Sequence, residues 1–486
     1  MAGVPMPKPK PEDLESFLRR QEAGTLVAVL LELAGAHEPV QARLSRMQIA
    51  SRPDKLAAAF RKTLAAWKRS TRFFGYREAA AFGRELEDWL DQVARELLPH
   101  HPPAAVELFE DFIEADATWF GRADDSGGAI GDAVRAACQH WLQAAAACEM
   151  PADAWPGRLL KLYEGDEYGA REHLLRHAHL LLDEPAQRRL VAELEYRLEQ
   201  AQSRASMTDR MPYAVARASA ALTLLSESLR DPDILVRATQ RLSPDPNPVQ
   251  RQGFVRAYMD ADRLADALVW LQQPWGHFEG SRQSLLAEVL ERLGRFEESL
   301  PIRRRAFEDS LSVHDLERWL EHLSETDRPQ ARELARRLAL AHDEPTAAAK
   351  LLLHLGEVEA AETRLLAGAA HVDGRNYDSL VPLAKSLRAH DCPRAETAVY
   401  RALLHGILDR ANARAYGHAA RYWSRLGEIA ASGIALQPLT PHEAFVAEIR
   451  TRHARKTSFW AHVNGARREQ PQPADFADDD DGDALV

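Results

Sequence analysis

The chain has 486 residues, of which 45% are hydrophobic, and a formal net charge of −11 at pH 7. This length allows a large buried core, the acidic balance argues against binding nucleic acid over the whole surface, and no apolar run is long enough to cross a bilayer. The start of the chain lacks the hydrophobic segment of a secretory signal. Three cysteines without close spacing indicate a reducing compartment, so we expect a cytoplasmic protein.

Helices are expected almost throughout, because alternating Val/Ile/Thr runs and Asn-Gly hairpin turns are scarce. We expect residues 1–10 and the acidic tail 466–486 to be disordered, since both have little to bury. Between them the sequence predicts an N-terminal helical region at 11–205 and a region of helical repeats at 206–465. A continuous helical array running through the boundary is the alternative.

A basic amphipathic helix is predicted over residues 55–72. Phe60, Leu64, Trp67, Thr71 and Phe74 form its buried stripe, by their 4-3-4-3 spacing. The cations on the other side are Arg61, Lys68 and Arg72, with Lys62 and Arg69 beside them. This face is either solvated and balanced by nearby acids such as Glu78, Glu85, Glu87 and Asp88, or a contact for nucleic acid or another polyanion.

Large aromatic residues follow at helical spacing among alanines and leucines. We expect them to form core rather than a stacking platform. They are Trp67, Phe73, Phe74, Tyr76, Trp89, Trp119 and Trp141.

The most loop-like polar segment is 124–132. Asp124, Asp125, Ser126 and Asp132 surround two glycines and precede a helix predicted over 129–148. The favoured interpretation is a turn with a helix N-cap. The alternative is a small-ligand or cation site made by these carboxylates and exposed backbone.

Three histidines, His173, His177 and His179, lie on a further predicted helix. His173 and His177 could share a face and bind a metal, whereas His179 should point elsewhere. No Glu follows in the pattern of a zinc protease, so chance clustering is favoured. No nucleophile lies beside a base, and we expect no metal, no cofactor and no catalytic activity.

Proline and aspartate mark several helix boundaries. Helices should begin at Asp183-Glu184-Pro185 and Asp343-Glu344-Pro345, and break at Asp231-Pro232 and at 243–248. Thr440-Pro441-His442-Glu443 is typical of a capping box. The helix that follows carries Arg450, Arg452, Arg455 and Lys456, and its aromatic residues should cover the open end of an array.

A Leu-Gly turn recurs three times in the second half of the chain. Leu293-Gly294, Leu355-Gly356 and Leu426-Gly427 are each followed by a small residue, Ser299, Ala361 or Ser432. Gly accepts the left-handed conformation that closes a helix, and the small residue permits close helix contact. Gly294 and Gly356 are 62 residues apart and Gly356 and Gly427 are 71 apart, close to two helical hairpins of about 34 residues each.

These turns and the residues around them resemble tetratricopeptide-type hairpins, most clearly over 285–307. Residues 263–267 and 393–395 resemble degenerate copies without the glycine. The resemblance implies a stacked array of helical hairpins and says almost nothing of function.

A second resemblance covers the whole chain. Residues 109–116 (Phe-Glu-Asp-Phe-Ile-Glu-Ala-Asp), 122–132 and 453–460 (His-Ala-Arg-Lys-Thr-Ser-Phe-Trp) are similar to a bacterial family of helical proteins of unknown function. A similar ending occurs in helical proteins with an N-terminal SWIM-type zinc finger, but this chain lacks the Cys-x-Cys and Cys-x-His pairs of that finger. The resemblance implies a fold and no activity.

The sequence therefore predicts an all-α protein, a right-handed superhelical array of helical hairpins similar to a tetratricopeptide solenoid. We expect a non-catalytic scaffold that binds a protein or peptide on its concave face. The alternative is polyanion binding by the 55–72 helix, modulated by the acidic tail. A weaker third hypothesis is an enzyme that uses the 124–132 loop.

Overall fold

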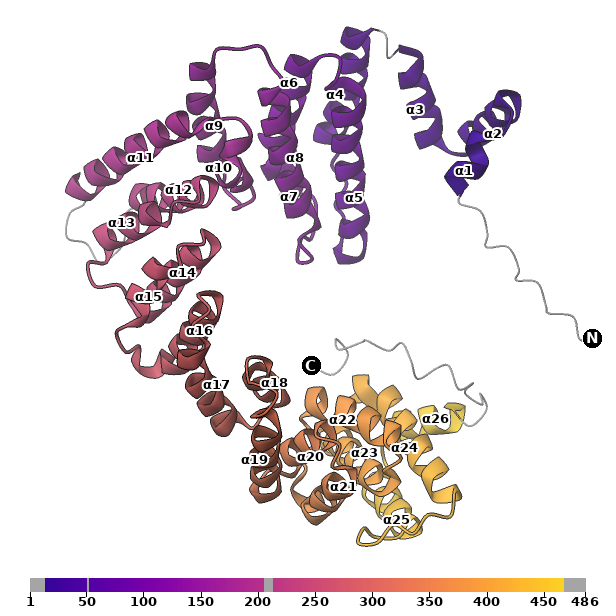
Figure 1. Cartoon of the computed structure of the whole chain (residues 1–486). Coiled ribbons are helices and arrows are strands. Elements are labelled where there is room, and N and C mark those ends of the chain that lie inside the picture. The colour runs from indigo at the N-terminus through magenta and orange to yellow at the C-terminus, as the bar shows by residue number, and fades with distance from the viewer. Residues whose placement is uncertain (1–13, 50–51, 205–212, 467–486) are drawn as a thin grey trace, which may run out of the picture. The chain divides into compact units, whose positions relative to one another are not determined.

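The computed structural model describes residues 14–49, 52–204 and 213–466 (Figure 1). Every extended regular element in these ranges is a helix, and one isolated bridge joins Phe74 to Ala123. The predicted all-α class is therefore confirmed. None of the described helices combines the length and apolar character needed to span a membrane. The chain divides into two compact units, 1–263 and 264–486.

The first unit contains fourteen described α-helices joined mostly by short connections. They are α1 (Leu14–Arg19), α2 (Ala23–Ala36), α3 (Glu38–Ile49), α4 (Pro53–Arg69), α5 (Tyr76–Gln92) continued by the π-helical turn η1 (Val93–Leu97), α6 (Pro102–Ile113), α7 (Asp116–Phe120), α8 (Ala129–Ala146), α9 (Trp155–Glu164), α10 (His173–Arg176) followed by the 3-10 turn η3 (Ala178–Leu180), α11 (Glu184–Arg204), α12 (Tyr213–Leu229), α13 (Pro232–Leu242) and α14 (Pro248–Asp260).

Aromatic side chains fill the core of this unit. The ring of Trp89 packs edge-on against Phe60 and Trp67 and stacks on Phe112, which in turn stacks on Trp119. The predicted core role of Trp89, Trp119 and Trp141 is confirmed, since all three are buried. The prediction is wrong for Phe73, which is exposed on the segment that links α4 and α5, and for Tyr76, which is exposed at the first position of α5.

The boundary between the compact units lies at 263, whereas the expected start of the repeats near 206 stays a prediction. The segment 205–212, at the expected boundary, lies outside the described residues, and α11 extends to Arg204 before it. Beyond it, Leu222 and Leu225 of α12 and Ile234 of α13 belong to the same core as Leu194 of α11. Burial of these apolar side chains keeps α12 and α13 with the first unit.

The second unit contains the remaining twelve α-helices. They are α15 (Leu264–Leu271), α16 (Glu279–Arg292), α17 (Phe296–Ser310), α18 (Val313–Glu321), α19 (Arg328–Ala341), α20 (Pro345–His354), α21 (Val358–Ala367), α22 (Tyr377–Ala389), α23 (Pro393–Asp409), α24 (Tyr416–Ala431), α25 (His442–Arg452) and α26 (Thr457–Ala466).

One helix-ending turn recurs along the chain. At each copy a residue with positive φ donates its N–H to the carbonyl three residues earlier, and the next N–H reaches the carbonyl five residues before it, which is a Schellman motif. At Gly294, for example, these bonds run from Gly294 to Glu291 and from Arg295 to Leu290. The left-handed residues are Arg230, Asp262, Gly294, Gly356, Asp391 and Ala411.

Two of the three predicted Leu-Gly turns are therefore confirmed, at Gly294 and Gly356, and Ser299 and Ala361 are fully buried as expected. The third is wrong, because Gly427 lies inside α24, and Ser432 is exposed. The two copies expected without glycine do contain the turn, at Asp262 and Asp391. Aspartate tolerates the left-handed conformation better than most residues with a Cβ.

The predicted helix boundaries at prolines are confirmed. Asp231 caps α13, and the carboxylate of Glu344 accepts backbone hydrogen bonds from Thr346 and Ala347 at the start of α20. The capping box at Thr440 is wrong. Both the hydroxyl and the carbonyl of Thr440 accept hydrogen bonds from Arg401 Nη1, at 3.0 and 2.9 Å, so α25 begins without a side-chain cap.

In the middle of the second unit, helices contact both the next helix along the chain and the next but one. α20 contacts α19 and α21 and also α18 and α22, and α21 contacts α23. One of the tightest backbone approaches joins α23 to the segment before α22. A Cβ added to Gly374 would overlap the carbonyl of Ala402, and one added to Gly406 would overlap the carbonyl of Gly374. These two glycines therefore fix the position of α23.

Candidate functional site

The basic helix α4 ends at Arg69, three residues before the predicted end. Arg122 explains the early end, because its guanidinium donates to the carbonyls of Trp67 and Arg72, with Nη1 2.6 Å from Trp67 O. Phe60 and Leu64 are buried and Trp67 is half-buried, as the stripe predicts, but Thr71 is exposed beyond the helix. The amphipathic character of the helix is thus confirmed over a shorter length.

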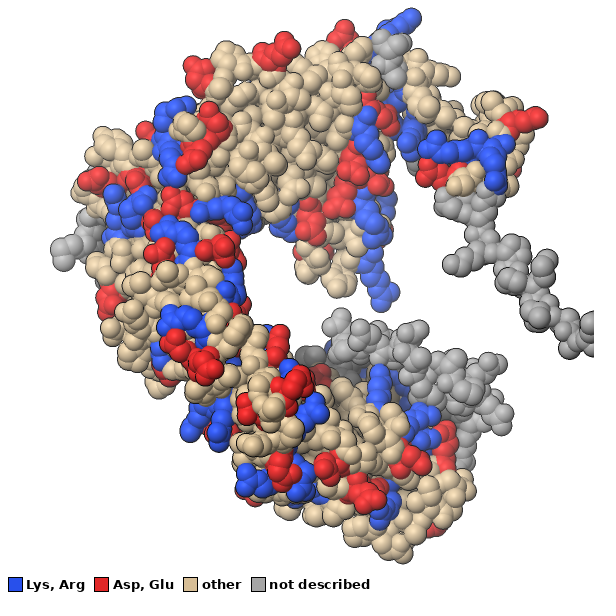
Figure 2. Space-filling model, viewed as in Figure 1, with Lys and Arg blue, Asp and Glu red and all other residues tan. Residues whose placement is uncertain are grey.

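Three of the five candidate cations of this helix are paired. Arg61 pairs with Glu107 at 2.5 Å, Lys68 with Asp111 at 2.7 Å and Arg72 with Glu78 at 2.8 Å. Lys62 and Arg69 are exposed and have no ion-pair partner within the described ranges. Acidic and basic side chains lie side by side over α4 and α5 in Figure 2. This geometry is that of a charge-balanced, solvated face.

The 124–132 segment forms a turn and a helix cap. The Asp124 carboxylate accepts hydrogen bonds from the backbone and hydroxyl of Ser126, which lower the pKa of Asp124. Asp125 accepts from the N–H groups of Ile130 and Gly131 at the start of α8. Asp132 pairs with Arg135 at 2.6 Å. Each of these polar groups has a local structural partner, which matches the favoured interpretation.

The three histidines at positions 173, 177 and 179 lie closer together than expected. The helix ends at Arg176, so the ring of His179 is not turned away: ring centroids are 5.0 Å apart for His173 and His177 and 6.0 Å apart for His177 and His179. Nδ1 of His173 lies 3.2 Å from Nε2 of Gln139. Burial lowers the pKa of His173 to about 4, with further contributions from His177 and nearby arginines.

A groove opens between α18, α20 and α22 of the second unit, with a volume of about 560 Å³. Buried Leu353 and Leu383 and half-buried Val313 provide apolar surface. Its polar lining comes from Lys350, His354, Ser386 and His390, and Pro382 completes it. α20 contacts both α18 and α22, so the groove lies among three neighbouring helices.

Lys350 is the principal charge of this groove. Its ammonium donates to the hydroxyl of Ser379 at 2.6 Å, and it has no ion-pair partner in the described part of the chain. Burial lowers the pKa of Lys350. His354 lies 2.6 Å from the carboxylate of Glu317 at the edge of the groove. A half-buried ammonium bonded only to a hydroxyl favours a ligand that brings a carboxylate.

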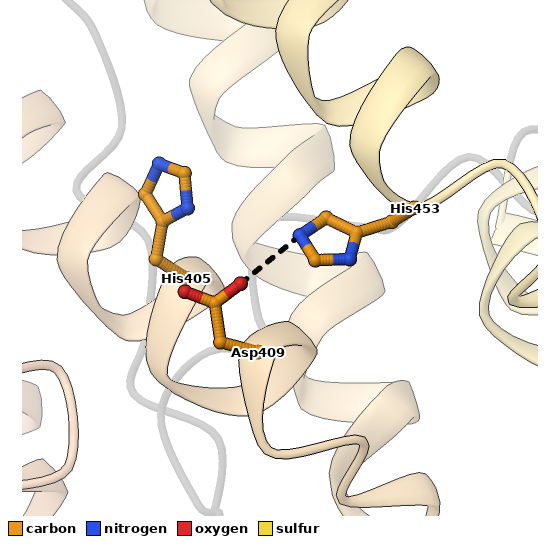
Figure 3. A group of neighbouring side chains, drawn as sticks. All are labelled: His405, Asp409 and His453. Atoms are coloured by element: carbon orange, nitrogen blue, oxygen red, sulfur yellow. Dashed lines mark ion pairs between the residues drawn. The ribbon is translucent and has the colours of Figure 1, made fainter.

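A second polar group of the same unit joins α23 to the end of α25. His405 and Asp409 lie four residues apart on one face of α23, and His453 follows the last residue of α25. One ligand atom of each lies within 4.8 Å of one ligand atom of both others. Figure 3 shows the carboxylate of Asp409 between the two imidazole rings, and Oδ1 lies 3.3 Å from Nε2 of His453.

Two nitrogens of this group are buried without a hydrogen-bond partner. They are Nδ1 of His405 and Nε2 of His453, the latter because its approach to Asp409 lacks hydrogen-bond geometry. His453 is 5% exposed, and burial lowers its pKa against the opposing effect of Asp409. Arg452 reaches the same carboxylate, with Nη2 3.2 Å from Oδ1 of Asp409. The ring of His405 packs edge-on against Phe445.

Neither the groove nor this histidine–aspartate group was identified from the sequence. The spacing of His405 and Asp409 is compatible with a shared helix face, but such pairs are common by chance. Their juxtaposition with His453 depends on how α25 packs against α23, which spacing along the chain does not reveal. Lys350 likewise differs from other lysines only in its burial, which the sequence does not reveal.

Residues 15–240 and 249–462 match the model of a family of unknown function, DUF6880. The chain belongs to this family. The DUF6880 match covers most of both units, and it confirms the expected membership in a family whose function is not known. No curated protein matches the sequence.

Proposed function

We propose that this DUF6880 protein is a non-catalytic scaffold that binds another protein through an extended acidic segment seated in the α18–α20–α22 groove. The observation that supports the proposal best is the half-buried Lys350 ammonium above apolar surface. A peptide carboxylate would supply the charged partner that Lys350 lacks, and apolar side chains of the peptide would cover Leu353 and Leu383.

The arrangement of the second unit is compatible with a tetratricopeptide-like solenoid. Support comes from the turn repeated at Gly294, Gly356 and Asp391, and from the contacts of α20 with α18 and α22, the helices that line the groove. In such arrays, successive helices of one row form a continuous binding surface. The fold alone does not imply this function, so the proposal depends on the groove.

The test is a pull-down with the tagged full-length chain, followed by identification of the retained protein and measurement of its affinity. Lys350→Met should weaken binding at least about tenfold, because a hydrogen bond to a charged group contributes about 1.5–3 kcal/mol. His390→Glu should also weaken it by placing a negative charge at the rim. Lys385→Glu is the matched control, since Lys385 is exposed on α22 and does not line the groove.

Circular dichroism of each variant checks that the fold is retained. Equal binding by the wild type, Lys350→Met and His390→Glu would contradict the proposal. Retention of nucleic acid that is lost as the salt concentration rises, and is weakened by Lys62→Glu with Arg69→Glu, would instead support the polyanion alternative.

A further inference from the structure

The group formed by His405, Asp409 and His453 has the composition of a transition-metal site. Two imidazoles and one carboxylate are a ligand set that proteins use for Zn²⁺, and three protein ligands leave a fourth position for water or another ligand. His405 lies on α23 and His453 directly follows α25, so an ion bound here would connect the end of α25 to α23.

The distances fit one shared ion. Zn–N and Zn–O bonds of about 2.0–2.1 Å at tetrahedral angles place two ligand atoms about 3.3 Å apart. The pair formed by Asp409 Oδ1 and His453 Nε2 is already at 3.3 Å. The remaining ligand atoms lie within 4.8 Å of each other, a gap that rotation of the partly exposed Asp409 and of His405 can close.

The two buried nitrogens without a hydrogen-bond partner also support a bound ion. A buried polar atom without a hydrogen-bond partner is unfavourable, and this group has two, Nδ1 of His405 and Nε2 of His453, of which the latter lies 3.3 Å from Oδ1 of Asp409. Arg452 is the competing cation, because it occupies Oδ1 of the same carboxylate. It is exposed on α25, so it can leave Asp409 without exposing apolar surface.

We propose that His405, Asp409 and His453 bind one Zn²⁺ ion, with a fourth coordination position open to solvent. The proposal is independent of the peptide groove, which none of these three residues lines. Without the ion, Arg452 neutralises the carboxylate of Asp409; with the ion bound, the ion takes over this role.

Isothermal titration of the metal-stripped full-length protein with Zn²⁺ tests the proposal. The wild type should bind one ion, and His405→Gln and Asp409→Asn should each weaken binding at least about a hundredfold, since each removes one of three ligands. Arg452→Ala should tighten binding several-fold by freeing the carboxylate. A site that only docks α25 by ion pairing would show no such gain.

His442→Gln is the matched control, because His442 also lies on α25 with an unpartnered Nδ1 but belongs to no ligand group. It should bind Zn²⁺ like the wild type. A second readout is thermal unfolding: saturating Zn²⁺ should raise the melting temperature of the wild type and not that of His405→Gln. Absence of binding by the wild type, or equal affinity in the wild type and His405→Gln, would overturn the proposal.

Discussion

A single side chain, His173, should make the stability of the first unit depend on pH. Its pKa is lowered to about 4, below the ordinary value of 6.5, chiefly by burial. The unfolded chain therefore binds a proton more readily between these two values, so the free energy of unfolding should fall as the pH decreases from 6.5 to 4. Because the ring is only partly buried, we expect a contribution on the order of 1 kcal/mol.

Chemical denaturation of wild type and His173→Gln at pH 7 and pH 4.5 measures this contribution. The variant should lose less stability on acidification than the wild type. His100→Gln, at an exposed position of the same unit, is the control and should follow the wild type. An identical loss in wild type and His173→Gln would show that His173 titrates alike in the folded and unfolded states.

At the scale of the element, the recurring Schellman turn requires a left-handed residue at its closing position. Two of the three Leu-Gly glycines occupy this position and the third does not. Gly294 and Gly356 have φ of 71° and 82°, whereas Gly427 lies inside α24. None of the three has an atom within 4 Å of an added Cβ, so backbone conformation alone should decide the effect. We expect Gly294→Ala and Gly356→Ala to lower the free energy of unfolding by about 1 kcal/mol each.

Gly427→Ala should instead stabilise the protein by roughly 0.5–1 kcal/mol, because alanine favours a helix interior. Asp391→Gly should stabilise it too, by relieving a left-handed residue that carries a Cβ. Thermal unfolding of these variants is the measurement. A loss of stability in Gly427→Ala equal to that in Gly294→Ala would contradict the assignment of Gly427 to a helix.

The same turns show how far the sequence predicts this fold. Periodicity and proline boundaries predict the helices well, because they depend on neighbouring residues. The Leu-Gly pattern fails at Gly427 because the helix continues through it to Ala431, and the residues that close turns elsewhere, such as Arg230, give no local signal. The groove and the histidine–aspartate group could not be predicted, since Lys350 and His453 meet their neighbours only through helix packing.

At the scale of the whole molecule, each unit has its own hydrophobic core. Leu142 of α8 is fully buried in the first core and Leu404 of α23 in the second. Calorimetry should therefore resolve two unfolding transitions. Leu142→Ala should lower the free energy of unfolding of the first unit, and Leu404→Ala that of the second, each by about 2–5 kcal/mol. Leu340→Ala, at an exposed site of α19, should shift neither by more than about 0.5 kcal/mol.

A single transition that both core substitutions lower equally would mean that the units unfold together. The two Trp-rich halves offer a second probe, because Trp141 reports on the first core and Trp423 on the second. Replacing one of them by phenylalanine should reduce the fluorescence change of the transition of its own unit and leave that of the other unit unaltered, because each unit has four further tryptophans.

The contact between Gly374 and Gly406 has a consequence for how this sequence can diverge. No side chain fits at either position while α23 stays where it is, and Gly406 directly follows His405. Drift at one glycine would thus displace the helix that presents His405 and Asp409. In related sequences, the two glycines should therefore be conserved wherever His405 and Asp409 are conserved, and replaced where they are replaced. Conservation of both pairs together would indicate that selection has maintained the position of α23 for the sake of these two side chains.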